Sequence, residues 1–375
     1  MNKLKYIVIT TFVLISNSII AQTESINVVT TAVPFLRISS DATASGMGTT
    51  GIATTPGVNA TYWNTGKLPF TTAKGAINAN YSPWLREWSN DTYLASVAGY
   101  YKLNDNETIH GVVRYFNPGD IDFTDKSGNK LQTYHPNEFG IDVGYARKLS
   151  ERMGLGLTLK YIRSDLSKGM QNGQTFKAGN AVAADLGFYY DLRKEDKGGW
   201  SFGATLANLG SKISYVENSN QKDFIPANLG LGTSYTRVIN DQNRINVALD
   251  INKLLVPTPP SLSDSFAVAT YRNKSVVGSW FSSFGDAPGG FKEELKEWQM
   301  SVGMEYWYDN MFALRAGYFY ENKIKGNRQH LSAGVTIKYN VATINFCYLA
   351  PSGKGINRNP LSNTLQFGLV FEINN

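Results

Sequence analysis

The residues that most often carry out chemistry are few in this sequence and lie far apart. There are three histidines, His110, His135 and His330, and one cysteine, Cys347. No two of the histidines have the spacing of metal ligands on one element, so the sequence predicts no metal site. A single cysteine cannot form a disulfide within the chain.

One pair of residues has side chains that suit acyl hydrolysis. His330 and Ser332 are two positions apart, so on a strand they share one face, and this pairing resembles the barrel enzymes that remove acyl chains from lipid A. Such an enzyme must present the pair to lipid, whereas the apolar residues at alternate positions from Leu331 to Ile337 claim that face. No acid stands where it would orient the imidazole. We therefore predict no catalytic residues and no enzymatic activity.

Three glycines, Gly46, Gly48 and Gly51, match the spacing of a dinucleotide-binding loop. That loop requires a buried strand before it, a helix after it, and an acid about twenty residues further on. Residues 34–37 (PFLR) do not form such a strand, and the next charged residue after the glycines is Lys67. Tight turns explain the glycines better, and no cofactor is expected.

The elements that position these residues are extended strands. In residues 300–308, apolar side chains stand at every second position, and the pattern repeats in 312–320 after Asp309-Asn310. A period of two indicates a strand with one apolar face and one polar or small face. Asp and Asn both tolerate positive φ, so this pair predicts a tight hairpin turn.

The same pattern occurs many times along the chain. The links between the segments that carry it alternate between short and long, and the longest link is 252–296. A soluble sandwich has no reason to sort its links in this way, whereas an outer-membrane barrel has short periplasmic turns and long extracellular loops. The predicted strands are 74–81, 92–102, 107–116, 137–148, 153–164, 180–191, 199–207, 226–238, 243–251, 297–308, 311–320, 330–339, 341–349 and 362–373.

The sequence therefore predicts an all-β fold, a 14-stranded antiparallel transmembrane β-barrel over residues 73–375. The apolar face of each strand would meet lipid and lipopolysaccharide, and closure would pair every backbone donor and acceptor. We expect the protein in the cell outer membrane, with its N- and C-termini periplasmic and its long loops extracellular. Acidic and basic residues are intermixed along the chain, so no nucleic-acid partner is expected.

The N-terminus has the layout of a secretory signal peptide. Lys3 and Lys5 precede an apolar run, and small residues end at Ala21, so we predict a signal peptide at residues 1–21. Its removal would lower the formal net charge from +6 to about +4. A barrel of this size has a lumen too wide for its own side chains to fill. Residues 22–72 are therefore predicted to form a plug of short helical turns and coil.

The 252–296 link is rich in aromatic residues and far longer than a usual loop. Phe291, Leu295 and Trp298 have helical spacing and predict a short amphipathic turn. So many apolar residues in a surface loop indicate a docking surface, and packing over the barrel's own mouth is the alternative. The residues predicted to bind a partner are Trp280, Phe281, Phe284, Asp286, Pro288, Phe291 and Trp298.

Residues 34–70 carry a family resemblance. Their sequence, PFLRISSDATASGMGTTGIATTPGVNATYWNTGKLPF, resembles the plug of the FadL-like outer-membrane proteins, and more closely that of the PorV family, the barrel subunits of the Bacteroidetes type IX secretion system. Residues 286–295 (DAPGGFKEEL) and 303–321 resemble this family too. One departure is Asn64-Thr65-Gly66, where the wider family has Asn-Pro-Ala. From the resemblance we expect these residues in the plug and lumen: Phe35, Leu36, Ile38, Asp41, Met47, Ile52, Trp63 and Asn64.

The resemblance implies a non-enzymatic role in protein export. PorV-like proteins receive cargo that carries a C-terminal signal domain as it leaves a large translocon barrel, and they shuttle it to a sortase-like attachment complex at the cell surface. The wider FadL-like fold implies an alternative, the passive transport of hydrophobic small molecules or fatty acids across the outer membrane. In that alternative, apolar residues of the plug would line a pocket for the transported molecule, although filling the core of the plug is the more frequent role of such residues. The residues concerned are Phe35, Leu36, Ile38, Met47 and Ile52.

Overall fold

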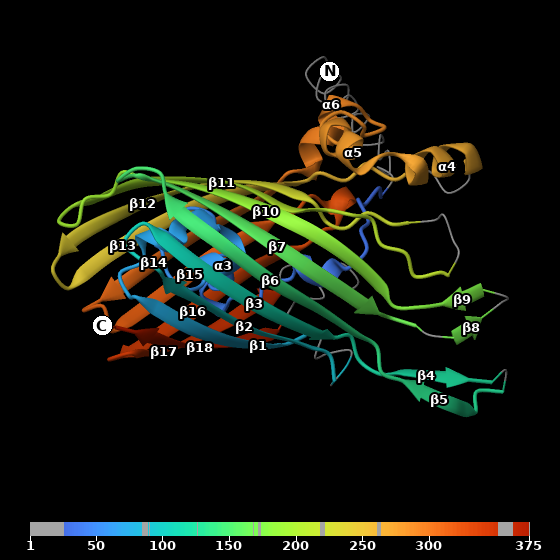
Figure 1. Ribbon diagram of the computed structural model, residues 1–375, viewed down its shortest axis with the longest axis horizontal. Helices are drawn as coiled ribbons and strands as arrows, with labels where there is room; N and C mark the ends of the chain where they lie inside the picture. The colour runs from blue at the N-terminus through green and yellow to red at the C-terminus, as the bar shows by residue number, and fades with distance from the viewer. Residues whose placement is uncertain are drawn as a thin grey trace, which may run out of the picture.

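The described residues form a closed β-barrel with helical turns in its lumen (Figure 1). The structure is a computed structural model. The predicted signal peptide, 1–21, and the first residues of the predicted plug, 22–25, lie outside the described part of the chain. The structure describes residues 26–84, 89, 91–125, 127–167, 169–171, 174–217, 222–260, 264–351 and 363–374.

Fourteen antiparallel strands make the barrel, and the first strand closes the ring by pairing with the last, from Gly75 opposite Ile373 to Tyr81 opposite Phe367. Each predicted strand agrees with its observed counterpart to within three residues at either end. The prediction of the fold class is confirmed. The strands are β1 (Gly75–Pro83), β2 (Tyr93–Lys102), β3 (Glu107–Asn117), β6 (Asn137–Lys148), β7 (Met153–Asp165), β10 (Gly179–Asp191), β11 (Gly198–Gly210), β12 (Asn228–Asn240), β13 (Asn243–Leu254), β14 (Gln299–Tyr308), β15 (Phe312–Tyr320), β16 (Gln329–Tyr339), β17 (Ala342–Pro351) and β18 (Thr364–Ile373).

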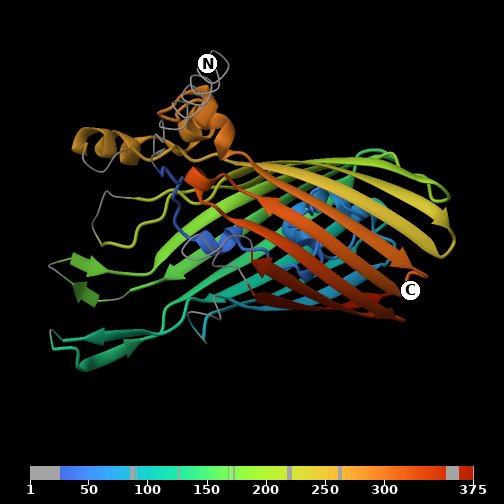
Figure 2. The ribbon, with the colours of Figure 1, turned by 180° about the vertical axis from the view of Figure 1, so that it is seen from behind.

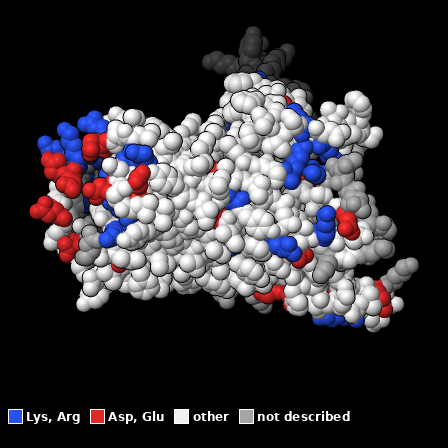
Figure 3. Space-filling view, in the orientation of Figure 1, with Lys and Arg blue, Asp and Glu red and all other residues white. Residues whose placement is uncertain are grey.

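The hairpin of β14 and β15 shows how alternating side chains give the barrel wall an apolar outer face and a small or polar inner face. Met300 and Val302 are 43% and 46% exposed on the outside, whereas Ser301 between them is buried on the inside. Asp309 and Asn310 connect the strands with φ values of 53° and 50°, the left-handed conformation that a two-residue hairpin turn requires. On the side of the barrel drawn in Figure 3, which is the front of Figure 1, charged side chains gather towards the two ends, and few lie on the wall between them.

The links sort by length between the two rims of the barrel, and we call the rim with the long links the long-link rim. Two of these links contain short hairpins that extend beyond the rim (Figure 1). The sequence did not predict them, because three to five residues are too few for an alternation to stand out. The hairpins are β4 (Ile121–Thr124) with β5 (Lys130–Tyr134), and β8 (Gly169–Gln171) with β9 (Gln174–Phe176).

The helical elements fall into two groups. The first group lies inside the barrel, as predicted for the plug (Figures 1 and 2), and consists of η1 (Pro34–Arg37), α2 (Ala42–Ser45), α3 (Ala60–Trp63) and η2 (Thr65–Phe70). No helix among the described residues has both the length and the hydropathy to cross a membrane. The second group, at the long-link rim, consists of α4 (Ser265–Asn273), α5 (Val276–Ser282), α6 (Phe291–Glu294), η3 (Leu295–Glu297) and η4 (Lys323–Lys325).

Candidate functional site

The plug fits against a belt of glycines on the inner wall of the barrel. A Cβ at Gly317 would overlap the backbone of Met47 and Gly48, and one at Gly203 would lie 2.6 Å from the carbonyl oxygen of Ile52. Such distances are far inside van der Waals contact, so only glycine allows the plug backbone to approach the wall this closely. The other inward glycines whose added Cβ would overlap the plug are Gly154, Gly156, Gly187, Gly230, Gly232 and Gly303.

A carboxylate on the wall fixes the middle of the plug. Asp250 of β13 accepts hydrogen bonds from the backbone N–H groups of Gly51 and Ile52, at 2.6 and 2.9 Å. Lys67 is fully buried beside them and donates to the carbonyl of Gly51 and to the hydroxyl of Thr54. Burial lowers the pKa of Lys67 to about 8. The plug is therefore bonded to the wall by the carboxylate of Asp250 as well as packed against it.

Asp41 and Trp63, placed in the plug by the family resemblance, hold two of its helical turns together. The carboxylate of Asp41 accepts the backbone N–H of Thr43 at 2.8 Å and so caps α2. Its other oxygen accepts the indole N–H of Trp63, at the end of α3, at 3.0 Å. Both residues therefore act within the plug.

Asn64 connects the plug to the wall at the position where the motif departs from the wider family. Its amide nitrogen donates to the carbonyls of Ile52 and Phe188, at 2.9 and 2.8 Å, and its side-chain oxygen accepts the N–H of Gly66 at 3.1 Å. Asn64 thus caps η2 and bonds β10 at once. The chain at this departure from the family motif forms a 3₁₀ helix, η2.

A cavity of about 200 Å³ lies between the plug and the long-link rim, and we call it the chamber. Leu36, Ile38, Ile52 and Trp63 line it. Phe35 does not, because it is fully buried in a stack with Phe116 of β3 at a centroid distance of 6.3 Å.

Met47, the remaining apolar residue of the predicted set, is buried where the plug meets β14 and β15. The eight residues thus divide between the chamber and the packed contacts of the plug.

His330 and Ser332 face the lumen, as the alternation predicted. His330 lines the chamber, stacks on Phe319, and has no hydrogen-bond partner for either ring nitrogen among the described residues. Ser332 accepts the N–H of Gly48 at 2.9 Å, which commits it to holding the plug. The two side chains do not form a hydrogen-bonded catalytic pair.

The long link after β13 folds into a helical unit, residues 264–297, which we call the rim subdomain. Figures 1 and 2 show α4, α5 and α6 to one side of the barrel axis, next to the long-link rim. The subdomain also contacts the rim of its own barrel, where Tyr271 of α4 packs against Phe224, so docking on a partner and packing on the barrel both stay predictions. A lateral position places the subdomain where a neighbouring protein in the same membrane can reach it.

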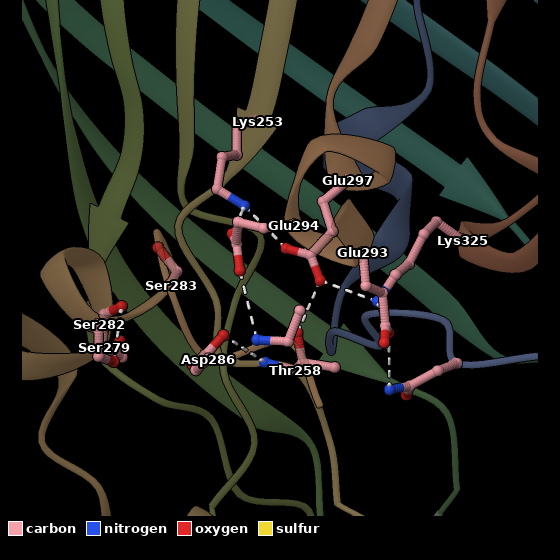
Figure 4. Close-up of polar contacts among 12 residues, drawn as sticks. Lys253, Thr258, Ser279, Ser282, Ser283, Asp286, Glu293, Glu294, Glu297 and Lys325 are labelled. Atoms are coloured by element: carbon pink, nitrogen blue, oxygen red, sulfur yellow. Dashed lines mark hydrogen bonds and ion pairs between the residues drawn. The ribbon is translucent and has the colours of Figure 1, made fainter. Parts of the chain in front are cut away.

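Buried ion pairs mount the rim subdomain on the barrel (Figure 4). Lys253, at the end of β13, has no exposed surface on its side chain and bonds Glu294 and Glu297 at 2.6 and 2.7 Å. Lys325 of η4 bonds Glu293 and Glu297 at 2.6 and 2.9 Å. Two lysines and three glutamates, from the end of β13 and from two links, are thus joined in one network.

Because of this network, α6 and η3 bury acidic side chains and expose apolar ones. Glu294 and Glu297 are buried, whereas Phe291 is 75% and Leu295 54% exposed. The sequence predicted the helical spacing but did not indicate which face would be covered. The buried lysines decide it, because an uncompensated buried ammonium would cost far more than an exposed phenylalanine.

The residues predicted to bind a partner differ in their exposed fraction. Phe281 is 75% and Phe284 45% exposed, and Pro288 is exposed beside Phe291. Asp286 is half-buried; it accepts the N–H of Thr258, which precedes the subdomain, at 3.3 Å, and it pairs with Lys274 of the subdomain at 3.4 Å. The phenylalanines therefore form the available surface, and Asp286 supports it. The half-buried members of the set are Trp280 and Trp298.

The attachment of the rim subdomain is expected to depend on pH. Burial opposes the ionisation of Glu297, but hydrogen bonds from Lys253, Thr258 and Lys325 outweigh it and hold its pKa below the ordinary 4.5. The pKa of Glu293 is lowered as well. The detached state would bind protons more readily, so attachment is fully stabilised above about pH 4.5 and weakens as the pH falls through the lowered pKa values. A fluorophore on a Phe281→Cys variant should gain rotational freedom in that range and remain restricted at neutral pH.

The comparisons with known proteins agree with this architecture. The family described as Type IX secretion system protein PorV matches residues 21–261. No curated protein matches the sequence. Among solved structures, the toluene transporter TbuX of Ralstonia pickettii is 12% identical over 87% of this chain and 95% of its own, with a TM-score of 0.51.

A second solved structure, the toluene transporter TodX of P. putida, is 10% identical over 88% of this chain and 98% of its own, with a TM-score of 0.52. Identities this low establish a shared barrel fold and nothing about what is bound.

Proposed function

The chain belongs to the PorV family of type IX secretion system proteins, and from this premise we propose that it is the component that binds exported cargo and carries it between complexes. As a member of that family it is an outer-membrane barrel of the secretion system. In the proposed role it receives the C-terminal signal domain of cargo at or after the translocon barrel. It then delivers the cargo to the sortase-like attachment complex at the cell surface.

The observation that supports this role best is the surface of the rim subdomain. Phe281 and Phe291 are each 75% exposed on a unit that buried ion pairs hold rigidly to the barrel. A soluble surface rarely keeps aromatic residues so open unless a partner covers them, and aromatic residues are the usual anchors of protein interfaces. Because the mounting is rigid, little conformational entropy would be lost on docking.

The proposal includes an orientation in the membrane. The long-link rim, with the rim subdomain, would face the cell exterior, and both termini would lie on the periplasmic side after removal of residues 1–21 as a signal peptide. Cargo that emerges from a neighbouring translocon barrel would then meet the subdomain on the outer side of the membrane. The lateral position of α4 to α6 suits contact with that neighbour.

Replacing three exposed phenylalanines tests the docking surface. A Phe281→Ser, Phe284→Ser, Phe291→Ser variant should still assemble a heat-resistant barrel, because none of these side chains lies in the barrel wall or in the plug. We expect it to lose most cargo export and most co-purification with the translocon, since truncated interface anchors typically cost about 2 kcal/mol or more each. Tyr339→Ser is the matched control, an aromatic residue 76% exposed at the opposite rim. Normal export in the triple variant would refute the docking role.

The chamber favours a second candidate function, the passage of hydrophobic small molecules across the outer membrane. Its lining combines apolar side chains, among them Leu36, Ile38 and Trp63, with charged and amide side chains such as Arg114 and Arg328, and it lies next to the long-link rim. Both solved structures named above are described as toluene transporters. A mutant lacking this chain would then lose uptake of an apolar nutrient, whereas the export role predicts that unprocessed cargo accumulates in the periplasm.

A further inference from the structure

The charged side chains that line the chamber all have one sign. They are those of Arg37, Arg114 and Arg328, and no aspartate or glutamate of the described chain is part of the lining. Arg114 is neutralised from outside the chamber by Asp142, whose carboxylate lies 2.9 Å from it. The other two guanidiniums share a single carboxylate, so the charge at their end of the chamber is positive.

The shared carboxylate belongs to Glu321, which is buried and does not line the chamber. Arg328 donates to both of its oxygens, from Nε and from Nη2, at 2.8 Å each. The side chain of Arg37, in η1 of the plug, reaches it only at 3.4 Å and has no other hydrogen-bond partner in the described part of the chain. Burial and the neighbouring Arg328 lower the pKa of Arg37 to about 9. Arg37 therefore has N–H donors left for a ligand.

An imidazole without a partner lies at the same end of the chamber. His330 is 2% exposed, and neither of its ring nitrogens has a hydrogen-bond partner among the described residues. Its ring stacks on Phe319 at a centroid distance of 5.3 Å, and the guanidinium of Arg328 is 5.6 Å from the centre of the same phenyl ring. An imidazole has at least one N–H donor, and buried polar groups are nearly always hydrogen-bonded. The cavity wall therefore presents a donor that lacks its acceptor.

The opposite side of the chamber is apolar. Leu36 and Ile38 of the plug, together with Trp84 after β1, line it and pack against a hydrophobic cluster on the inner faces of β2, β3, β7 and β10. Phe319 and His330 belong to β15 and β16, which lie across the ring from those strands. A molecule that spans the chamber would thus meet cationic donors at one end and apolar side chains at the other.

We propose that the chamber is a binding site for an apolar chain that ends in a carboxylate. The carboxylate would accept hydrogen bonds from Arg37 and His330, and the chain would lie along the apolar side. A monoanion suits the site because two guanidiniums and one carboxylate leave a single positive charge, and the planar fork of arginine matches a carboxylate. A neutral hydrocarbon would leave these buried donors without partners.

Two sources supply this chemistry. A fatty acid has it, as the transport of apolar molecules would require, and so does the C-terminus of a polypeptide, as the carriage of cargo would require. The site is inferred from the chamber alone and involves no residue of the rim subdomain. Its failure would therefore leave the proposed docking role in protein export standing, and the failure of that docking role would leave the site standing.

Binding to the full chain in nanodiscs of zwitterionic lipid tests the site, with binding to empty nanodiscs subtracted. Octanoate and octanol form one pair of probes, and an N-acetylated apolar tripeptide and its C-terminal amide form the other. We expect the acid of at least one pair to bind at least about ten-fold more tightly than its neutral partner. The pair whose acid binds more tightly identifies the source of the carboxylate. Equal binding of acid and neutral partner in both pairs would overturn the inference.

Two substitutions test the assigned donors. Arg37→Gln should weaken binding of the preferred acid at least about ten-fold and leave binding of its neutral partner within about two-fold. His330→Phe keeps an aromatic ring on Phe319 and breaks no hydrogen bond of the described chain, so it should fold normally and still bind the acid at least about three-fold more weakly. Arg237→Gln is the matched control, an exposed arginine of β12 outside the lumen, and should bind the acid as the unmodified chain does. Full acid binding in both lumen variants would overturn the inference.

Discussion

Alanine at both Gly303 and Gly317 is expected to displace the plug from β14 and β15 and to destabilise the assembled barrel by about 2 to 6 kcal/mol. Each added Cβ would overlap backbone atoms of Met47 or Gly48. A backbone held on both sides cannot move aside as a flexible side chain would, so the overlap must be relieved by shifting the plug. The hydrogen bond from Gly48 to Ser332 would be lost in that shift.

Two measurements would detect the displacement. The double variant should lose the heat-resistant mobility of the folded barrel at a lower temperature, and it should conduct ions in a planar bilayer where the unmodified chain does not. Gly140→Ala is the matched control, because Gly140 also faces the lumen but its added Cβ would meet only ordinary contacts, the nearest at 3.9 Å. Unchanged stability and conductance in the double variant would show that the plug is not fixed by the glycine belt.

The strands of the barrel could be predicted from the sequence because their signal is local and long. Nine to thirteen residues with a period of two, such as Met153–Asp165, specify both the strand and the face that meets lipid. The turn at Asp309 and Asn310 was predictable because its signal is also local: Asp and Asn both tolerate positive φ, and both adopt it here. Closure then followed from the even number of strands and the order of the links.

The rim subdomain was less predictable because its structure depends on residues far apart in the chain. Asp264 and Ser275 do cap α4 and α5 and could have signalled these helices, but aromatic and β-branched residues obscure the helical pattern. The orientation of α6 depends on Lys253 and Lys325, which are 72 residues apart. No local pattern relates these two lysines to the glutamates between them.

The glycine belt also depends on contacts between residues that are far apart in the sequence, so the sequence alone could not explain it. Gly303 and Gly317 were visible as small residues on the inward face of a hairpin. What they contact, the backbone of Met47, is more than 250 residues away in sequence, so the reason for their size could only come from the structure. The sequence thus predicts the wall and the presence of a plug, whereas the fit between them requires coordinates.

Replacing Lys253 with methionine is expected to detach the rim subdomain while the barrel remains folded. Lys253 is completely buried and is the cation nearest to both Glu294 and Glu297. Methionine fills a similar volume but leaves these carboxylates without that charge, and removing one partner of a buried ion pair costs about 3–5 kcal/mol. Lys325 still compensates Glu293 and Glu297, so the loss should be local to the subdomain.

Limited proteolysis would measure the detachment. Cleavage within 264–297 should accelerate strongly in Lys253→Met, while the barrel keeps its heat-resistant mobility. Lys292→Met is the matched control, an exposed lysine of α6, and should change stability by less than about 0.5 kcal/mol. Adding Glu294→Gln and Glu297→Gln to Lys253→Met removes the unpaired charges and should restore part of the resistance. If Lys253→Met resists protease as the unmodified chain does, the subdomain is held by its apolar contacts, and the ion pairs contribute little to its position.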